Sequence, residues 1–388
     1  MKYKIILAVL LISIIVVVLF WRLEPVNNLS MPDFFVGIDT AYDNVEDVTK
    51  LVDEVKSYTN FFGIGSTGIV WNFTKLDLVC QYVCDSGLYF MVYKHPPPDL
   101  ETQNQTQWVA DAKQKWGDCF LGLYIADEFG GHQIDADEMM RVKEADNYTD
   151  ASNKYVEYVD EFLRHYTGDY LHSEDLLSIT ADYALYWFDY KAGYDVVLSE
   201  FGWNHSRLLN IALNRGAANM HNKDWGSIIT WTYREPPYLE SADELYYDMV
   251  LAYLSGAKYV IILNYSQEKV TPYGTLTDEH LDAMKRFWEY IHTNPERLGI
   301  YCPTCTRIAY VLPKDYAWGF RGSNDKIWGL WVDDASIQMG TDVDYLLHTH
   351  HLSLDIIYDD PDYYNNLCIY SKLYFWNGTV IDGFSKCF

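Results

Sequence analysis

The sequence has few basic residues and lacks the short motifs that identify several common enzyme classes. Among its 388 residues, 29 are Lys or Arg and 55 are Asp or Glu, so the formal net charge is −26. A surface of this sign repels phosphate backbones, and we therefore expect no nucleic-acid partner. The chain contains no Gly-x-Ser-x-Gly, no His-Glu-x-x-His and no P-loop. The chain therefore lacks the most recognisable signatures of serine hydrolases, zinc proteases and nucleotide hydrolases.

The chain begins with an apolar run, Ile5–Trp21, that contains no charge, proline or glycine. Its 17 residues are at the short end of what spans a bilayer as a helix. No Ala-x-Ala cleavage signal follows, which favours a signal anchor over the alternative of a cleaved signal peptide. Two lysines precede the run and one arginine follows it, a bias that places the N-terminus in the cytoplasm. We expect a single-pass anchor in the cell membrane over residues 1–22, a linker over 23–33, and a large extracytoplasmic remainder.

Sequons and cysteines agree with an extracytoplasmic glycoprotein. Asn-x-Ser/Thr sequons begin at seven positions: Asn28, Asn72, Asn104, Asn147, Asn204, Asn264 and Asn377. Outside the cell, the seven cysteines can form disulfides. We expect Cys119 to pair with Cys80 or Cys84, and Cys368 to pair with Cys387, while the odd count leaves at least one thiol over.

Eight short apolar runs alternate with longer amphipathic segments. The runs predict strands at 34–39, 61–65, 88–93, 121–126, 177–181, 195–199, 227–232 and 259–264. Four of the spacers predict helices, at 45–58, 206–220, 241–255 and 277–294. Near-continuous apolar runs are typical of parallel strands buried on both faces. An open doubly wound sheet would normally have a Gly-rich loop after its first strand, which this chain lacks. We therefore predict an α/β fold, a (β/α)8 TIM barrel, over residues 34–300.

A smaller unit follows the predicted barrel. Residues 301–388 contain three further runs that predict strands, at 307–313, 354–359 and 371–378, with a helical stretch around 343–351. This pattern predicts a short α/β domain.

Acidic and aromatic residues follow the predicted strands, where a barrel of this kind has its active site. The candidates for catalysis are Glu128, Glu235 and Glu200. The candidates for substrate binding are Asp39, Tyr42, Tyr93, His95, Asp127, Asp182, Trp203, Asn204, Trp231, Tyr233, Arg234 and Asn264. Paired carboxyls among aromatic rings suit the hydrolysis of a glycosidic bond, in which one protonates the leaving oxygen and the other attacks or activates water. We expect no metal and no organic cofactor.

The segment GLYIADEFGG (122–131), with Glu128 after the fourth strand, resembles the acid/base position of clan A (β/α)8-barrel glycoside hydrolases. Those families commonly have Asn before that Glu, whereas this chain has Asp127. In that clan the nucleophile is a Glu at the end of the seventh strand. The resemblance implies Glu235, in TWTYREPPYLES (230–241), for this role.

The tail carries a second resemblance. The segments VLPKDYAWGFRG (311–322) and LDIIYDDP (354–361) resemble the small flavodoxin-like, glutamine-amidotransferase-like domain that follows the barrel in some β-galactosidase-like enzymes. The resemblance implies the same order of domains here.

These observations predict a membrane-anchored, extracytoplasmic glycoside hydrolase that acts on carbohydrate. Glu128 is the expected acid/base. Its partner is Glu235 or Glu200, of which Glu200 directly follows the sixth predicted strand. The alternative is a non-catalytic cell-surface protein whose barrel binds glycan or has a structural role. A metal-dependent deacetylase would need several converging His and Asp side chains, and the predicted strand ends supply only one histidine, His95.

Overall fold

The structure is a computed structural model that describes residues 31–65, 67–94, 102–135, 140–168, 176–265, 271–295, 307–322 and 325–383. The predicted anchor, residues 1–22, and His95 lie outside the described residues. Within the described residues, no helix combines the length and the apolar character needed to cross a membrane. By its contacts the chain divides into Met1–Asp33 and Phe34–Phe388, and the second of these units carries the fold.

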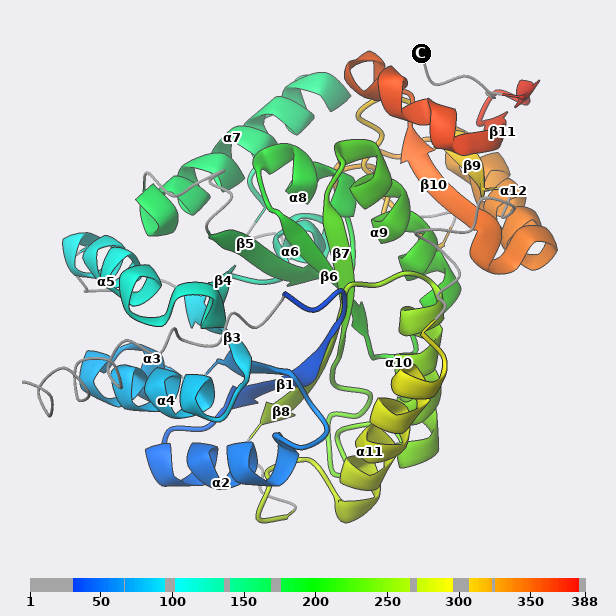
Figure 1. Ribbon diagram of the computed structural model, residues 1–388. Helices are drawn as coiled ribbons and strands as arrows, with labels where there is room; N and C mark the ends of the chain where they lie inside the picture. Colours follow the sequence, from blue (N-terminus) through cyan, green and yellow to red (C-terminus); the bar gives the residue numbers. More distant parts are fainter. Residues whose placement is uncertain are drawn as a thin grey trace, which may run out of the picture. The chain divides into compact units, whose positions relative to one another are not determined.

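Eight parallel strands close into a barrel in chain order (Figure 1). The strands are β1 Phe35–Ala41, β2 Phe61–Ile64, β3 Tyr89–Lys94, β4 Phe120–Ile125, β5 Leu177–Asp182, β6 Val196–Phe201, β7 Asp224–Ile229 and β8 Tyr259–Tyr265. β8 pairs with β1 and closes the ring. The predicted TIM barrel is confirmed, and seven predicted strands match closely. The prediction for β7 was displaced, because the strand ends at Ile229 rather than Thr232.

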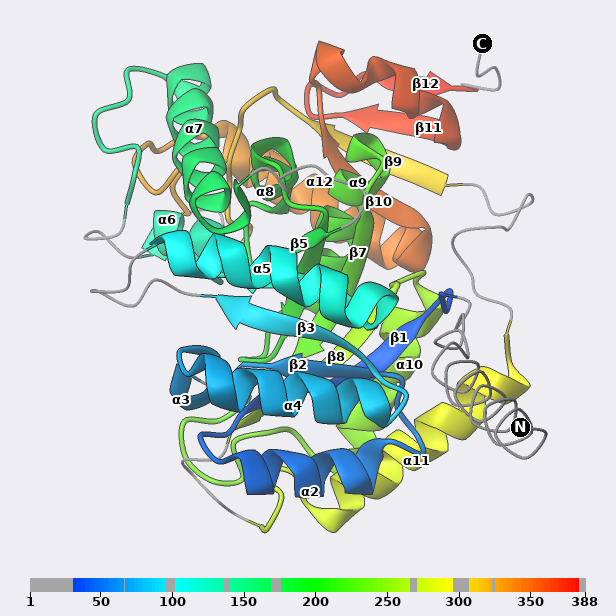
Figure 2. The ribbon, with the colours of Figure 1, turned by 60° about the vertical axis from the view of Figure 1, so that its left-hand side comes forward.

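Helices follow the strands and lie around the barrel (Figure 1, Figure 2). They are α2 Val45–Val55, α3 Thr67–Val70, α4 Phe73–Asp85, α5 Thr102–Trp116, α6 Phe129–Asp135, α7 Tyr148–Thr167, α8 Tyr186–Ala192, α9 Arg207–His221, α10 Ala242–Leu254 and α11 Asp278–Thr293. Their starts are encoded locally. Ser241 and Glu244 form a capping box at α10, and the Ser206 hydroxyl accepts a hydrogen bond from the first turn of α9.

The interior of the barrel is aromatic at its amino-terminal end. The rings of Phe35 and Tyr259 stack with centroids 5.0 Å apart, and Tyr89 contacts Phe35 edge-on at 5.5 Å. Phe61 completes this layer. Successive side chains of a strand point to opposite faces, so every second residue points into the barrel. The aromatic layer therefore fills the amino-terminal end of the barrel. A site inside the barrel is expected at the carboxyl end of the strands.

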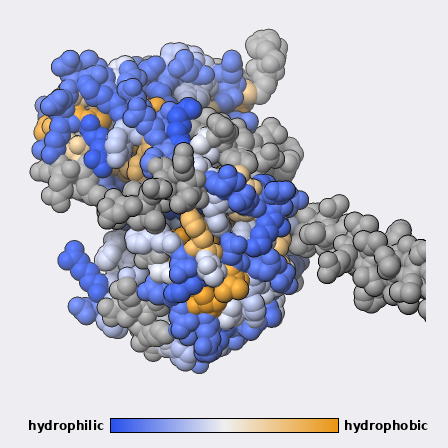
Figure 3. Space-filling model, turned by 90° about the vertical axis from the view of Figure 1, so that its left-hand side faces the viewer, coloured by the Kyte–Doolittle hydropathy of each residue, from blue (hydrophilic) through white to orange (hydrophobic). Residues whose placement is uncertain are grey.

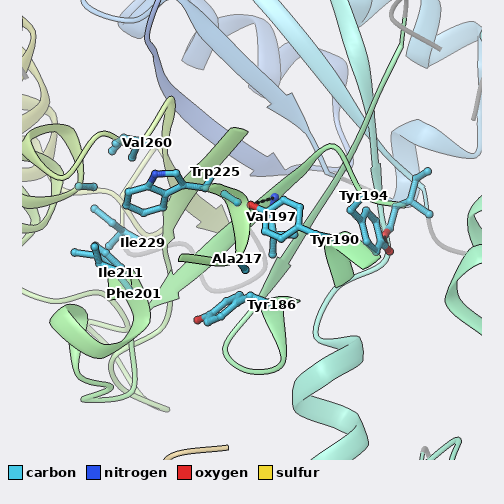
Figure 4. Packing of buried hydrophobic residues seen from close by; sticks show 14 of the residues in the cluster. Tyr186, Tyr190, Tyr194, Val197, Phe201, Ile211, Ala217, Trp225, Ile229 and Val260 are labelled. Carbon is cyan, nitrogen blue, oxygen red and sulfur yellow. Dashed lines mark hydrogen bonds between the residues drawn. The ribbon is translucent and has the colours of Figure 1, made fainter. Parts of the chain in front are cut away.

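A second apolar layer lies between the strands and the outer helices (Figure 4). It includes Tyr190 from α8, Val197 from β6 and Trp225 from β7. The Tyr190 hydroxyl accepts a hydrogen bond from the Val197 N–H at 3.3 Å. Much of the aromatic content is thus core. The face shown in Figure 3 is mainly hydrophilic, with apolar residues exposed in separate patches.

The C-terminal part forms a four-stranded sheet in the order β10-β9-β11-β12, with α12 Ala335–His350. Its strands are β9 Arg307–Leu312, β10 Leu354–Tyr358, β11 Tyr370–Phe375 and β12 Val380–Asp382. Three of these strands were predicted, whereas the antiparallel β12 was not. β10 packs against α9, where Arg215 Nε donates to Asp355 Oδ1 at 2.7 Å and Nη2 donates to the Leu352 carbonyl at 2.7 Å. This ion pair is buried.

One disulfide joins Cys84, at the end of α4, to Cys119, which directly precedes β4. This resolves the two pairings that the sequence allowed for Cys119. Cys80 is free and buried. Cys368 is disulfide-bonded as well, and its predicted partner, Cys387, lies outside the described residues.

Candidate active site

A cavity of about 460 Å³ lies at the carboxyl ends of the barrel strands. Its lining residues are Asp39, Ala41, Gly65, Tyr93, Tyr124, Asp127, Glu128, Glu200, Ile228, Thr230, Trp231, Leu263 and Tyr265. Four of them are carboxylic acids and four are aromatic, while none of these described residues is Lys, Arg or His. The cavity is therefore strongly acidic and has aromatic walls.

The alternation of side chains along the strands explains two of the acids. Val196 and Leu198 of β6 point into the barrel core, and Glu200 is the next inward position. Phe35 of β1 points inward as well, and Asp39 lies four residues further along the same face. The inward side of each strand is thus apolar first and becomes acidic at its carboxyl end.

Two adjacent acids line the cavity after β4, which a regular strand could not achieve. The strand ends at Ile125, and the backbone then takes left-handed conformations at Ala126 (φ 52°) and Glu128 (φ 56°). These conformations are unfavourable for residues other than glycine. They allow Asp127 and Glu128 to line the same cavity. Strained backbone of this kind is frequent at functional sites.

Asp182, at the end of β5, holds this turn in place rather than lining the cavity. Its carboxylate accepts hydrogen bonds from the backbone N–H groups of Gly130 (2.6 Å) and Gly131 (2.9 Å) in the first turn of α6. A Cβ at Gly130 would lie 2.5 Å from the Ala184 carbonyl oxygen, so glycine is needed for this close approach. Asp182 is completely buried, and the structure places it in a capping position instead of the substrate-binding position that we expected.

Glu128 and Glu200 form a pair of neighbouring carboxyls. His132, one turn along α6, places Nε2 3.2 Å from Glu128 Oε2, and this hydrogen bond raises the pKa of His132 above its ordinary value. Burial, together with the charges of Glu128, Asp182 and Asp127, holds the pKa of Glu200 well above its usual range. A hydrogen bond between the two glutamates acts in the same direction. The surroundings of Glu200 therefore favour its protonated form.

Asp39 and Asp127 form a second acidic pair in the cavity. Burial and the charge of Asp127 raise the pKa of Asp39 to about 7. Burial and the charge of Glu128 raise the pKa of Asp127 to about 6. The Tyr93 hydroxyl donates to Asp127 Oδ1 at 3.5 Å. Among the described residues, no group of three or more His, Cys, Asp or Glu is arranged to hold a metal ion.

The loops after β6 and β7 carry the other candidates. Trp203, Tyr233, Arg234 and Glu235 line a separate cavity of about 560 Å³, and Asn204 is exposed beside them. Because β7 ends at Ile229, Glu235 is an exposed loop residue rather than the residue that closes the strand. The expectation that the resemblance gave for its position is thus corrected. Glu200 is the carboxyl that the structure brings to Glu128.

Tyr42 and Asn264 are buried and contact each other rather than the cavity. Asn264 Nδ2 donates to the Tyr42 hydroxyl at 2.9 Å, and Asn264 Oδ1 accepts from the Thr275 N–H at 3.1 Å. The cavity therefore brings together six of the predicted residues: Asp39, Tyr93, Asp127, Glu128, Glu200 and Trp231.

Three polar or aromatic side chains at the site, Tyr265, His132 and Tyr124, were not among the predicted candidates. Tyr265 continues the inward alternation of β8, so the pattern of that strand could have identified it. His132 lies four residues after Glu128, and helical spacing could have identified it had α6 been predicted. Tyr124 carried no such signal, because the pairing of β3 with β4 contains a register shift and strict alternation fails in that strand.

Comparisons with known proteins give no family for the chain: no family model and no curated protein matches it. The GH99 endo-alpha-mannosidase from Bacteroides thetaiotaomicron is similar at a TM-score of 0.40 and 14% identity, over 65% of this chain and 80% of that chain. The catalytic module of a family 98 glycoside hydrolase from Streptococcus pneumoniae gives 0.41 and 10%, over 85% and 66%. Thiamine phosphate pyrophosphorylase from Pyrococcus furiosus gives 0.35 and 9%, over 67% and 97%. Similarity this low, to proteins with different activities, assigns no function.

Proposed function

We propose that the protein is a glycoside hydrolase whose catalytic carboxyls are Glu128 and Glu200. The observation that carries the proposal is the pair itself: Glu200 is a buried carboxyl whose surroundings favour its protonated form, and its neighbour Glu128 has Oε2 3.2 Å from His132 Nε2. Hydrolysis of a glycosidic bond needs a carboxylic acid and a second carboxyl together. Glu200 supplies the acid and Glu128 the nucleophile. This assignment reverses the role that the resemblance implied for Glu128.

In the first step, Glu200 gives its proton to the glycosidic oxygen while a Glu128 oxygen bonds to the anomeric carbon, and the leaving sugar departs as an alcohol. In the second step, Glu200, now ionised, takes a proton from water, whose oxygen displaces Glu128 from the anomeric carbon. Glu128 and Glu200 line the same cavity, and the charge of Glu128 acts on Glu200. In this two-step route, typical of enzymes whose carboxyls lie about 5–5.5 Å apart, we expect the product to retain its anomeric configuration.

The aromatic walls support a carbohydrate substrate. Trp231 and Tyr265 meet edge to face with centroids 5.5 Å apart, and Tyr93 and Tyr124 do so at 5.2 Å. Rings of this size offer flat apolar surfaces on which the faces of sugar rings can stack, while carboxyls hydrogen-bond the hydroxyls. No cofactor is needed for this chemistry.

The proposal includes the extracytoplasmic, membrane-anchored location expected from the sequence. The disulfide between Cys84 and Cys119 supports an oxidising compartment. Four sequon asparagines, Asn72, Asn147, Asn204 and Asn377, are exposed, as glycosylation would require, whereas Asn264 is buried. Anchoring by residues 1–22 and an amidotransferase-like origin of the C-terminal sheet belong to the same proposal.

The test is hydrolysis of a panel of oligosaccharides by the purified protein and by three variants. Glu128→Gln and Glu200→Gln should each lower kcat by about 100-fold or more, because each removes a group that acts in the transition state. Glu235→Gln is the control and should keep full activity. Circular dichroism confirms folding, and proton NMR of the first product reports its anomeric configuration.

Two results would contradict the proposal. Unchanged activity in the Glu128 and Glu200 variants would remove the pair from the mechanism. Glycan binding without hydrolysis by the unaltered protein would favour the non-catalytic alternative.

A further inference from the structure

The cavity holds two more carboxyls than glycoside hydrolysis uses. Glu128 and Glu200 account for the acid and the nucleophile, which leaves Asp39 and Asp127. Asp39 is only 4% exposed. In the described part of the chain, its Oδ1 atom has no hydrogen-bond partner. Because buried polar atoms normally have partners, this atom needs an explanation.

The fold makes room for the Asp39 carboxyl at some cost. A Cβ at Gly63 would lie 2.4 Å from Asp39 Oδ1, and a Cβ at Gly65 would lie 2.9 Å from the same atom. Two glycines near the end of β2 therefore leave space for a side chain that gains no described hydrogen bond at Oδ1. The charge of Asp127 also acts on Asp39. When both are ionised, two neighbouring buried acids destabilise each other unless a cation compensates them.

The lining offers no such cation. None of the described residues around the cavity is Lys, Arg or His, and the nearby His132 is engaged by Glu128. A positively charged ligand would supply the counter-charge that the described lining residues do not provide. Described residues also offer no arrangement suited to a metal ion, so an organic cation is the better match.

We propose that the cavity binds a sugar with a free amino group, whose ammonium pairs with Asp39 and Asp127. This inference rests on the proposed glycoside hydrolase function, because it names the substrate class of the same cavity. An anionic sugar would be repelled by the four acids. A neutral sugar or an N-acetylated one could donate hydrogen bonds to Asp39, but would leave the two acids without a counter-charge.

The test measures equilibrium binding, which does not require turnover. Isothermal titration calorimetry compares three tetrasaccharides: one of glucosamine, one of N-acetylglucosamine and one of glucose. The protein used is the Glu200→Gln variant, so that hydrolysis does not consume the ligand. We expect the glucosamine oligomer to bind at least about tenfold more tightly than the other two.

Asp39→Asn, introduced into the same protein, should remove this preference, since it keeps the shape of the side chain and deletes the charge. The matched control is Asp118→Asn, which makes the same change at an exposed acid that precedes β4 at the opposite end of the barrel. It should leave all three affinities unchanged. A thermal melt of each variant checks that it is folded.

Equal affinities for the three oligomers, tighter binding of a neutral one, or no binding of any of them would overturn the inference. So would an equal loss of affinity for all three in Asp39→Asn, because Asp39 would then act as a general hydrogen-bond partner. A failure of the proposed hydrolase function can be distinguished from a failure of this inference. Preference for the amino sugar without hydrolysis by the unaltered protein would reject only the enzyme, and hydrolysis of neutral glycans without that preference would reject only this inference.

Discussion

Replacing Asp39 by asparagine should stabilise the protein, and the gain should grow with pH. Asp39 has its pKa raised from 3.8 to about 7, first by burial and then by the charge of Asp127. The folded protein therefore holds this proton more tightly than the unfolded chain does. Between these two pKa values the stability contributed by the neutral carboxyl is lost as pH rises. An asparagine at this position has no proton to lose, so the variant escapes the penalty.

The size of the effect follows from the shift. About three pKa units at 1.36 kcal/mol each give roughly 4 kcal/mol at full ionisation. At about pH 4.5 the unfolded chain has already begun to ionise, and Asp39→Asn should raise the free energy of unfolding by about 1 kcal/mol. At about pH 7.5 the gain should be about 4 kcal/mol. Any free-energy cost of burying the asparagine amide is the same at both pH values, so it cancels when the two gains are compared.

The assay is urea unfolding at both pH values, followed by tryptophan fluorescence and analysed by linear extrapolation. Asp118→Asn serves as the control, because it removes the same charge from the exposed surface and should show no comparable trend. A stability difference between Asp39→Asn and the unaltered protein that stays constant from the lower pH to the higher would refute the reasoning. So would a gain that shrinks as pH rises.

Three further predictions test other parts of the molecule. Ala126→Gly relieves a left-handed backbone at the site, so urea unfolding should show a gain of up to about 1 kcal/mol while kcat falls. Arg215→Met leaves a buried carboxylate unpaired and should lower the free energy of unfolding by about 3–5 kcal/mol. The exposed Arg164→Met should change it by at most about 1 kcal/mol. Glu128→Gln should lower the pKa of His132 towards its ordinary value, as followed by NMR of the imidazole protons, and an unchanged value would place the two side chains apart.

The strands were predictable because strands covered on both faces require continuous apolar runs, which few loops contain. The start of β7 was not predictable, because the strand begins with Asp224, Trp225 and Gly226, a charged residue and a glycine among them. β12 was missed for the opposite reason: its three residues are exposed, so no buried face marks them in the sequence. The starts of α10 and α11 were predictable from Ser241 and Thr277, whose side chains satisfy the first backbone N–H groups.

The site was predictable only as a set of strand ends. Glu200 and Asp39 follow from the period of two along β6 and β1. The meeting of Glu128 with Glu200 depends on the left-handed turn after β4, which no residue in the sequence announces, because Ala126 is not a residue that favours it. Glu235 was favoured by resemblance, and only the early end of β7 excludes it from the acidic cavity.

Because Arg215 and Asp355 form a buried contact, the barrel and the C-terminal sheet depend on each other for stability. α9 precedes β7 of the barrel, yet its arginine donates to a strand and to carbonyl groups of the C-terminal sheet. A chain truncated after the barrel would leave this guanidinium without its carboxylate and would expose the face of α9 that β10 covers. The C-terminal sheet therefore stabilises the barrel by covering α9. We expect changes to the barrel, natural or engineered, to require the sheet to be kept with it.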